Sequence, residues 1–382
     1  MNTDNPLSKL RRVHVVGIGL HAYQRPSDTP YVSLGLAAIR MALDDAAITW
    51  PEIGSTTVGT ALLGMAPGRE LIRYLGATGR PVHQVENASA SGSSAFRTAV
   101  QQVASGFTDV ALAVGVDKVG PVAHGYAKSG VPTGINEVIA PATHFALLMQ
   151  AHMTETGTTS EQIAAVAVKN HQNGSLNPFA QRRQARTLEE VLAGPRIAGE
   201  LTRLQCTLVG EGAAAVIVAS DEAIERLGID ASRSVQVVSS AAQSEALYGS
   251  ENADVALTRS TVTEALEQAG IEPTDLDIVE LHDAFAIEEL LYTEAIGLCK
   301  PGDAGRAVAA GEFSIGGRVA VSPSGGLLAM GHPIGPTGVG QIAEITRQLR
   351  GEAGDRQHHG ARTGLAHMVG IGAVCVAHVL QR

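Results

Sequence analysis

The chain has few cysteines, few aromatic residues and no long apolar run, and each shortage excludes a class of protein. Its 382 residues include only three cysteines, which lie far apart: Cys206, Cys299 and Cys375. No pair has metal-ligand spacing, so we expect neither a disulfide framework nor a metal site, and a reducing compartment is the default. The apolar runs are too short to span a membrane, and residues 1–10 lack the apolar core of a signal peptide. These absences predict a cytoplasmic protein without a membrane segment.

The remaining composition is typical of a large α/β protein. Aromatic residues make up 3% of the chain, hydrophobic residues 45%, and there are 43 glycines, which suits close contacts between helices and strands. The formal net charge of −10 argues against nucleic acid as a partner. One local basic group, Arg182, Arg183 and Arg186, has the charge to meet a phosphate. Taken alone, these three arginines are somewhat better explained by a solvated loop face.

Alternating strand and helix patterns occur twice along the chain, which predicts sheets covered by helices and two duplicated halves. The first strand ends in Gly17-x-Gly19, read as a glycine turn and only a weak signal for a dinucleotide site. The boundaries that follow are 1–225 for the first half, with an inserted loop domain at about 120–206, and 226–382 for the second. We expect strands over 13–19, 55–63, 110–116, 213–220, 235–241, 276–281, 365–369 and 373–380, and helices over 33–47, 93–105, 143–156, 160–175, 253–269, 286–297 and within 325–349.

Ser89 marks the first candidate site. Residues 85–96 predict a strand end, a tight turn and a helix of small residues. A side chain at such a turn lies at the positive end of the helix dipole, where an enzyme gains by placing a nucleophile. An ordinary serine helix cap is the equally simple alternative.

Three later motifs carry polar groups at the ends of predicted strands or in glycine-rich loops. His282 follows a strand and precedes a helix, a common functional position, and a histidine that only caps that helix is the less favoured alternative. His332 is the one imidazole in the glycine- and proline-rich segment 324–338, a rigid loop that packing alone hardly explains. Gly370 and Gly372 lie between two strands and offer either backbone donors for an oxyanion or a hairpin turn.

In this order, the segments resemble the thiolase superfamily, and within it the sterol-carrier-protein type of thiolase and its bacterial lipid-transfer-protein-like relatives. The resemblance covers nearly the whole chain and is carried above all by His282-Asp283-Ala284-Phe285 and Gly331-His332-Pro333. It implies a five-layered αβαβα fold with two similar halves, a homodimer and an acyl-CoA substrate, with no cofactor beyond the coenzyme A of that substrate. Some bacterial relatives of this type work with a small OB-fold, zinc-ribbon protein, so such a partner is expected here.

The resemblance also implies roles for single residues. Ser89 matches the position of the family's acylated cysteine, and His332 matches the histidine that activates it. His282 stands where the degradative enzymes have the asparagine of Asn-Glu-Ala-Phe, on the oxyanion side. The resemblance further implies that Gly370 and Gly372 offer backbone donors to the oxyanion. Arg182 and Arg183 are implied to contact the nucleotide of coenzyme A.

Two departures from the family pattern affect the chemistry. The nucleophile is Ser89, and the second family cysteine, a general acid/base, is replaced by Met368, with Ala284 at the position that supplies it in some sterol-carrier types. A serine is far less acidic than a cysteine, whose unperturbed pKa is about 8.5, and it needs a positioned base. Its acyl ester also passes the acyl group less readily to a thiol, so we expect Ser89 to depress thiolysis strongly.

The expected function is that of a thiolase-like C-acyltransferase that cleaves or makes 3-oxoacyl-CoA thioesters, and Ser89 leaves three explanations open. Ser89 is an introduced replacement of a working cysteine; or it forms an acyl-serine for an unusual acceptor; or the enzyme is a retro-aldol lyase or decarboxylase without a covalent intermediate. In the last case His282 and His332 would be the acid/base and oxyanion groups, although aldolase relatives tend to carry tyrosines at both positions. A catalytically silent acyl-CoA or lipid-binding scaffold is the alternative from another class.

Overall fold

The computed structural model describes residues 6–119, 141–246, 253–370 and 374–382. Its main feature is a ten-stranded sheet in the order β10-β9-β11-β12-β8-β1-β7-β4-β2-β3. The strands of the first half are β1 (Val13–Gln24), β2 (Ser55–Gly59), β3 (Val82–Val85), β4 (Val110–Asp117) and β7 (Glu211–Ser220). Those of the second half are β8 (Val235–Ser244), β9 (Ile278–Glu280), β10 (Ala320–Val321), β11 (Thr363–Gly370) and β12 (Val374–Gln381), and a separate small sheet pairs β5 (Arg196–Ala198) with β6 (Leu201–Thr202).

The two halves of the sheet have the same topology. When the strands of each half are taken in sequence order, both halves are arranged as third, second, fourth, fifth and first strand. The directions of corresponding strands agree as well. Strands β2 and β9 pair in parallel with both neighbours, while β7 and β12 pair antiparallel with both. The halves are joined between β1 and β8, where His14 pairs with Gln236 and Val15 with Val235. Identical topology is what a duplicated chain predicts, and the boundary between residues 225 and 226 stays a prediction.

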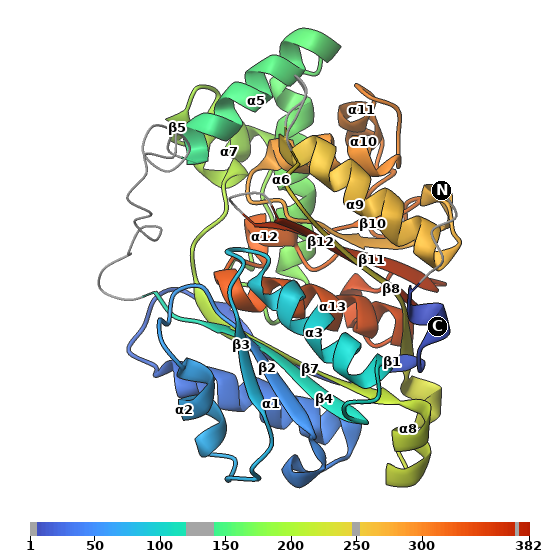
Figure 1. The fold of residues 1–382 in the computed structure, drawn as a ribbon. Helices are drawn as coiled ribbons and strands as arrows, with labels where there is room; N and C mark the ends of the chain where they lie inside the picture. The colour runs from blue at the N-terminus through green and yellow to red at the C-terminus, as the bar shows by residue number, and fades with distance from the viewer. Residues whose placement is uncertain (1–5, 120–140, 247–252, 371–373) are drawn as a thin grey trace.

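Helices divide the molecule into five layers (Figure 1). The central helices α3 and α13 pack against each other between the two halves of the sheet, α1 covers β1 and β7 on one outer face, and α9 covers β8 and β12 on the other. The αβαβα fold expected from the resemblance is thereby confirmed. The helices are α1 (Tyr31–Ala46), α2 (Pro67–Arg73), α3 (Ser91–Ala104), α5 (Pro141–Thr156), α6 (Ser160–Ser175), α7 (Leu188–Leu192), α8 (Asp221–Leu227), α9 (Ala253–Ala269), α10 (Ala286–Ile296), α11 (Ala304–Ala309), α12 (Gly326–Ala329) and α13 (Ile334–Arg350).

Strand β4 shows how the sequence sorts the two faces of the sheet. Leu112 and Val114 pack in the outer cluster with α1, whereas Ala111 and Ala113 belong to the central cluster with α3 and α13. Side chains alternate between faces in a strand, so a pattern of large and small residues gives one bulky and one thin face. The thin face lets the central helices approach the sheet closely, which fits the low aromatic content.

The two glycines of Gly17-x-Gly19 lie inside β1, so the glycine turn expected there is wrong. A Cβ at Gly17 would lie 2.3 Å from the carbonyl oxygen of Ala42, and one at Gly19 would lie 2.0 Å from that of Ala38. Both carbonyls belong to α1, so the glycines allow helix and strand to touch. This packing role accounts for the motif without a dinucleotide.

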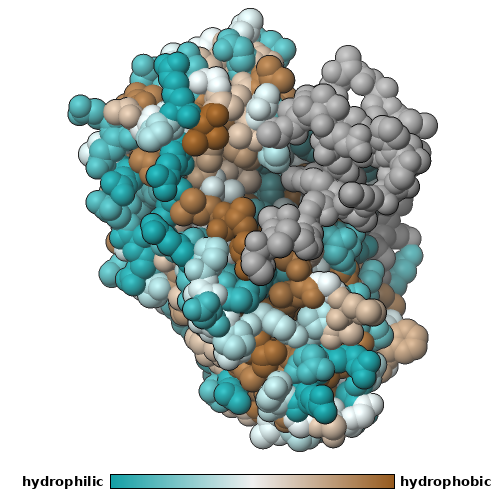
Figure 2. All heavy atoms as spheres, turned by 90° about the vertical axis from the view of Figure 1, so that its left-hand side faces the viewer, coloured by the Kyte–Doolittle hydropathy of each residue, from teal (hydrophilic) through white to brown (hydrophobic). Residues whose placement is uncertain are grey.

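The described part of the insertion, residues 141–206, contains α5, α6 and α7. Helix α6 contacts α10, α11 and α12 of the second half, so the insertion covers that side of the molecule (Figure 1). Figure 2 shows the side of the molecule that lies at the left of Figure 1, on which hydrophobic patches alternate with hydrophilic ones. Within the described ranges, no helix is both long enough and apolar enough to cross a membrane.

Candidate active site

Ser89 lies in the turn between β3 and α3, two residues before the helix begins. Its neighbour Ala88 has a φ of 48°, a left-handed conformation that costs a residue other than glycine on the order of 1 kcal/mol. Ser91 Oγ donates to the carbonyl oxygen of Ala88 and accepts from the backbone N–H of Asn87, which holds the turn. The side chain of Ser89 is buried at the positive end of the α3 dipole.

His332 faces Ser89 with its lone pair. Ser89 Oγ lies 2.9 Å from His332 Nε2, and on the other side of the ring Nδ1 lies 2.8 Å from Thr337 Oγ1. Thr337 donates its own hydrogen to the carbonyl oxygen of Pro333, so its oxygen accepts the hydrogen on Nδ1. Nε2 is then the acceptor for the Ser89 hydroxyl. Burial, and to a smaller extent His282, lowers the pKa of His332 well below its usual value, so the ring is neutral at pH 7.

His282 meets the same place from β9. Its ring centroid lies 5.5 Å from that of His332, with the two ring planes nearly perpendicular. His282 Nδ1 lies 3.0 Å from Glu288 Oε1, whereas its Nε2 is buried without a hydrogen-bond partner among the described residues. The three side chains that the resemblance implies as catalytic are therefore brought together.

The duplication explains this convergence. Ser89 precedes α3 by two residues and His332 precedes α13 by two, so they occupy corresponding positions before the two central helices. The helices touch where a Cβ at Gly92 would lie 2.3 Å from the carbonyl oxygen of Gly335. Asp117, at the end of β4, accepts from the N–H of Gly335 at 2.6 Å and fixes the start of α13.

The predicted oxyanion loop lies beside the nucleophile turn as far as it is described. A Cβ at Gly370 would lie 2.4 Å from the carbonyl oxygen of Asn87. Gly372 falls outside the described residues. Met368, at the position of the second family cysteine, is fully buried and packs against Ala90, so an apolar side chain fills the place of the missing thiol.

The two arginines predicted to contact coenzyme A differ in their surroundings. Arg182 is partly buried, and its Nη1 donates to the carbonyl oxygens of Cys206 and Leu328, which links the insertion to α12. Burial lowers the pKa of Arg182 to about 10. Arg183 is exposed. Their contact with coenzyme A stays a prediction.

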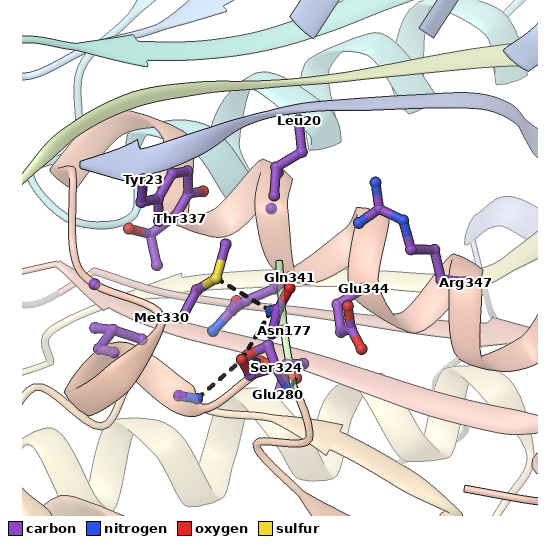
Figure 3. A pocket seen from close by; sticks show the side chains of 14 residues that line it. Leu20, Tyr23, Asn177, Glu280, Ser324, Met330, Thr337, Gln341, Glu344 and Arg347 are labelled. Carbon is purple, nitrogen blue, oxygen red and sulfur yellow. Dashed lines mark hydrogen bonds between the residues drawn. The ribbon is translucent and has the colours of Figure 1, made fainter. Parts of the chain in front are cut away.

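Thr337 also lines a small cavity of about 20 Å³, room for roughly one water molecule (Figure 3). Tyr23 Oη and Gln341 Oε1, which belong to lining residues, are buried without a partner among the described protein atoms. Glu280 lines it too and accepts from the N–H and the hydroxyl of Ser324. Burial raises the pKa of Glu280 to about 8, and the nearby carboxylate of Glu344 adds to that rise. No group of three or more His, Cys, Asp or Glu side chains in the described part of the chain could hold a metal ion.

Sequence reasoning missed the residues that orient the two imidazoles. Thr337 follows His332 by five residues and Glu288 follows His282 by six, each in the first turn of the next helix. The available signal was a polar residue in the first turn of the helix that follows each candidate histidine. For Asp117 the sequence contained no such signal beyond its position at the end of a strand, because its hydrogen-bond partners come from distant segments.

The two halves match known families in sequence. The thiolase N-terminal domain family matches residues 18–188, and the thiolase C-terminal domain-like family matches residues 239–382. Sterol carrier protein 2 from Homo sapiens is 34% identical over 391 residues, which cover 96% of this chain and 71% of that protein. The chain belongs to the thiolase family.

Further similarities agree with this thiolase membership. An acetyl-CoA acetyltransferase from Methanothermobacter thermautotrophicus is 35% identical, covering 98% of this thiolase and 100% of the relative. The solved Ltp2-ChsH2(DUF35) aldolase has a TM-score of 0.84 at 22% identity, covering 97% of this chain and 98% of the other, a likeness that concerns the fold. The similarity to sterol carrier protein 2 confirms the sterol-carrier type, and the family supports an enzyme of the acyltransferase class.

Proposed function

We propose that this thiolase is a C-acyltransferase of 3-oxoacyl-CoA thioesters in which Ser89 takes the acyl group and His332 is its base. The observation that carries the proposal is the 2.9 Å contact between Ser89 Oγ and His332 Nε2. Thr337 supports it, because it fixes the ring with the lone pair toward the hydroxyl. A buried hydroxyl at a helix N-terminus, facing a neutral imidazole, is the arrangement that nucleophilic acyl transfer needs.

In the cleavage direction, Ser89 Oγ would attack the C3 carbonyl carbon while its proton passes to Nε2 of His332. The C2–C3 bond would then break, leaving an acyl ester on Ser89, and its electron pair would go to C2 of the departing acyl-CoA, which takes up a proton. Claisen-type condensation runs these steps in reverse. The lowered pKa of His332 makes its cation costly, and a serine gives up its proton less readily than the more acidic cysteine, so we expect acylation of Ser89 to be slower than that of a cysteine.

A second candidate is a retro-aldol or decarboxylase reaction without an acyl-enzyme. The specific observation in its favour is that Ser89 is paired with an imidazole of lowered basicity, a weak way to activate a hydroxyl. The third candidate, a silent acyl-CoA or lipid-binding scaffold, would bind its ligand beside the same residues without chemistry.

Intact-mass measurement with a panel of 3-oxoacyl-CoA and acyl-CoA thioesters separates these candidates. We expect an acyl adduct on the wild type that is lost in Ser89→Ala, and faster CoA-dependent cleavage in Ser89→Cys. Identical spectra for wild type and Ser89→Ala, with product formed by both, would favour the non-covalent lyase. No adduct and no product with any of the three proteins would favour the scaffold.

We propose further that the enzyme works as a cytoplasmic homodimer with acyl-CoA held near Arg182 and Arg183, and with a small OB-fold, zinc-ribbon partner. The name of the similar aldolase structure joins Ltp2 to ChsH2(DUF35), which supports the partner. Light scattering after size-exclusion chromatography tests the dimer, and the mass of a single chain at micromolar concentration would contradict it.

A further inference from the structure

The loss of the second family cysteine leaves one proton without a carrier. The C2 carbon of the acyl-CoA must gain a proton in cleavage and lose one in condensation. Met368 cannot move it, and His332 Nε2, 2.9 Å from Ser89 Oγ, is committed to the proton of that hydroxyl. His282 is different, because its Nε2 is buried beside His332 with no partner among the residues described. A buried polar atom without a protein partner is available to a water molecule or to the substrate.

The other nitrogen of His282 is held by Glu288. The carboxylate accepts from three donors: Oε1 from His282 Nδ1 at 3.0 Å and from the Tyr292 hydroxyl at 3.1 Å, and Oε2 from the N–H of Phe285 at 2.8 Å. Burial and the charge of Glu288 raise the pKa of Tyr292 well above its usual value, so its hydroxyl keeps its hydrogen and donates. The hydrogen on Nδ1 is therefore fixed, and Nε2 alone is free to take up and release a proton.

The remaining titratable groups around His282 do not compete for this task. His367 Nε2 lies 3.0 Å from Thr258 Oγ1, and burial lowers the pKa of His367 to about 3, so it is neutral. Asp254 faces the same region from α9, and burial raises its pKa. Neither group touches the free nitrogen of His282.

We propose that His282, oriented by Glu288 and Tyr292, is the acid/base group that moves the proton at C2 of the acyl-CoA, in place of the missing thiol. The inference rests on the proposed function. In cleavage, the proton on Nε2 of the imidazolium passes to C2 as the C2–C3 bond gives its electron pair to that carbon, and His282 becomes neutral. In condensation, neutral Nε2 takes the proton from C2, and the carboxylate of Glu288 balances the resulting charge. Glu288 and Tyr292 are positioning residues.

Exchange of the C2 hydrogens of acyl-CoA for deuterium in heavy water tests this step apart from the acylation of Ser89. Glu288→Gln cannot accept from both His282 and Phe285, so we expect exchange to slow about 100-fold. Acylation of Ser89 by a simple acyl-CoA breaks the thioester and moves no proton at C2, so its rate and KM should stay within about threefold of wild type. Tyr292→Phe keeps the carboxylate and is expected to lose only about threefold to tenfold. The matched control is Glu294→Gln on the same helix, which alters the carboxylate beside His152 outside the site, and it should exchange at the wild-type rate.

The outcomes separate this inference from the proposed function. Wild-type exchange rates in both Glu288→Gln and His282→Ala would overturn the role of His282, as would acylation of Ser89 without any C2 exchange in the wild type. Exchange that requires Glu288, without any adduct on Ser89, would uphold His282 and overturn the acyl-serine. Equal losses of exchange and of Ser89 acylation by a simple acyl-CoA in Glu288→Gln would mark Glu288 as structural and contradict the proposal.

Discussion

Thr337 lies in the first turn of α13 and accepts the hydrogen of His332 Nδ1, while its own hydroxyl is committed to Pro333. These two contacts set the tautomer of His332 from the side of the ring opposite Ser89. The same logic applies to Glu288 and His282. At the scale of single residues, the chemistry of this site depends as much on the group behind each imidazole as on the imidazole itself.

Thr337→Val should remove this control over His332. The buried Nδ1–H would lose its acceptor at a cost of about 1–3 kcal/mol, which the ring avoids by turning or by carrying its hydrogen on Nε2. We expect acylation of Ser89 to slow about tenfold to 100-fold, measured as the rise of the acyl-enzyme mass with time. Thr337→Ser keeps the hydroxyl and should stay near wild type. A valine variant that acylates as fast as wild type would show that the tautomer is set elsewhere.

The sequence marked Ser89, His282 and His332 as candidates at the end of a strand or in a glycine-rich loop, and the resemblance to the thiolase superfamily implied their roles. It could not predict Thr337 or Glu288 as partners, since a polar residue in the first turn of a helix is usually an ordinary cap. Only the position of the imidazole relative to the helix distinguishes the two cases, and that position is set by tertiary packing.

The central helices α3 and α13 bring the site together at the scale of elements. Their first turns meet at Gly92 and Gly335, and Asp117 ties the start of α13 to β4. The distance between Ser89 and His332 is thus set by how closely two helix ends can approach. Small residues at this contact are part of the site, although they do no chemistry.

Gly92→Ala tests that contact. A Cβ there would lie 2.3 Å from a backbone oxygen, which cannot rotate away, so the helices must move apart. Overpacking of this kind costs about 1–3 kcal/mol, which outweighs the gain of about 1 kcal/mol in helix propensity. We expect a lower free energy of unfolding in urea and slower acylation of Ser89. Gln101→Ala, at an exposed position of the same helix, should change neither, and an unchanged Gly92→Ala would mean that the helix contact does not set the site.

Regular hydrophobic periodicity was enough to predict the bounds of helices that make no special contact with the site. The helices expected over 160–175 and 253–269 have those bounds in the structure. The single helix expected within 325–349 is instead α12 and α13, interrupted at residues 330–333, because Pro333 has no N–H to donate and the chain turns to bring in His332. The strand expected over 276–281 shortens to β9, since the residues after Glu280 leave the sheet for the site. The departures occur where function bends a regular element.

At the scale of the whole molecule, duplication provides two helix N-termini that meet beside Ser89 and His332, and the sheet order shows the duplication more clearly than the sequence does. The halves kept their topology while their side chains diverged, which leaves a nucleophile before one helix and a base before the other. Buried carboxyl groups also accompany this arrangement, because Glu280, Asp283 and Glu289 all lie in the interior near the end of β9, and burial raises the pKa of each.

Glu280 makes the stability of the molecule depend on pH. Its folded-state pKa of about 8 is raised from 4.5 by burial, so the folded protein holds a proton that the unfolded chain releases. The contribution of Glu280 to the free energy of unfolding is fully present below pH 4.5 and is lost as the pH rises to about 8, at roughly 1.4 kcal/mol for each pH unit between the two pKa values.

Glu280→Gln stays neutral and can still accept from Ser324, so its free energy of unfolding should exceed that of wild type by a few kcal/mol more at about pH 9 than at about pH 5. Urea unfolding at both pH values measures the difference, with exposed Glu189→Gln as the control that should show none. Parallel pH profiles for Glu280→Gln and wild type would mean that Glu280 is ionised in the folded protein, where another group or a water in the cavity stabilises its carboxylate.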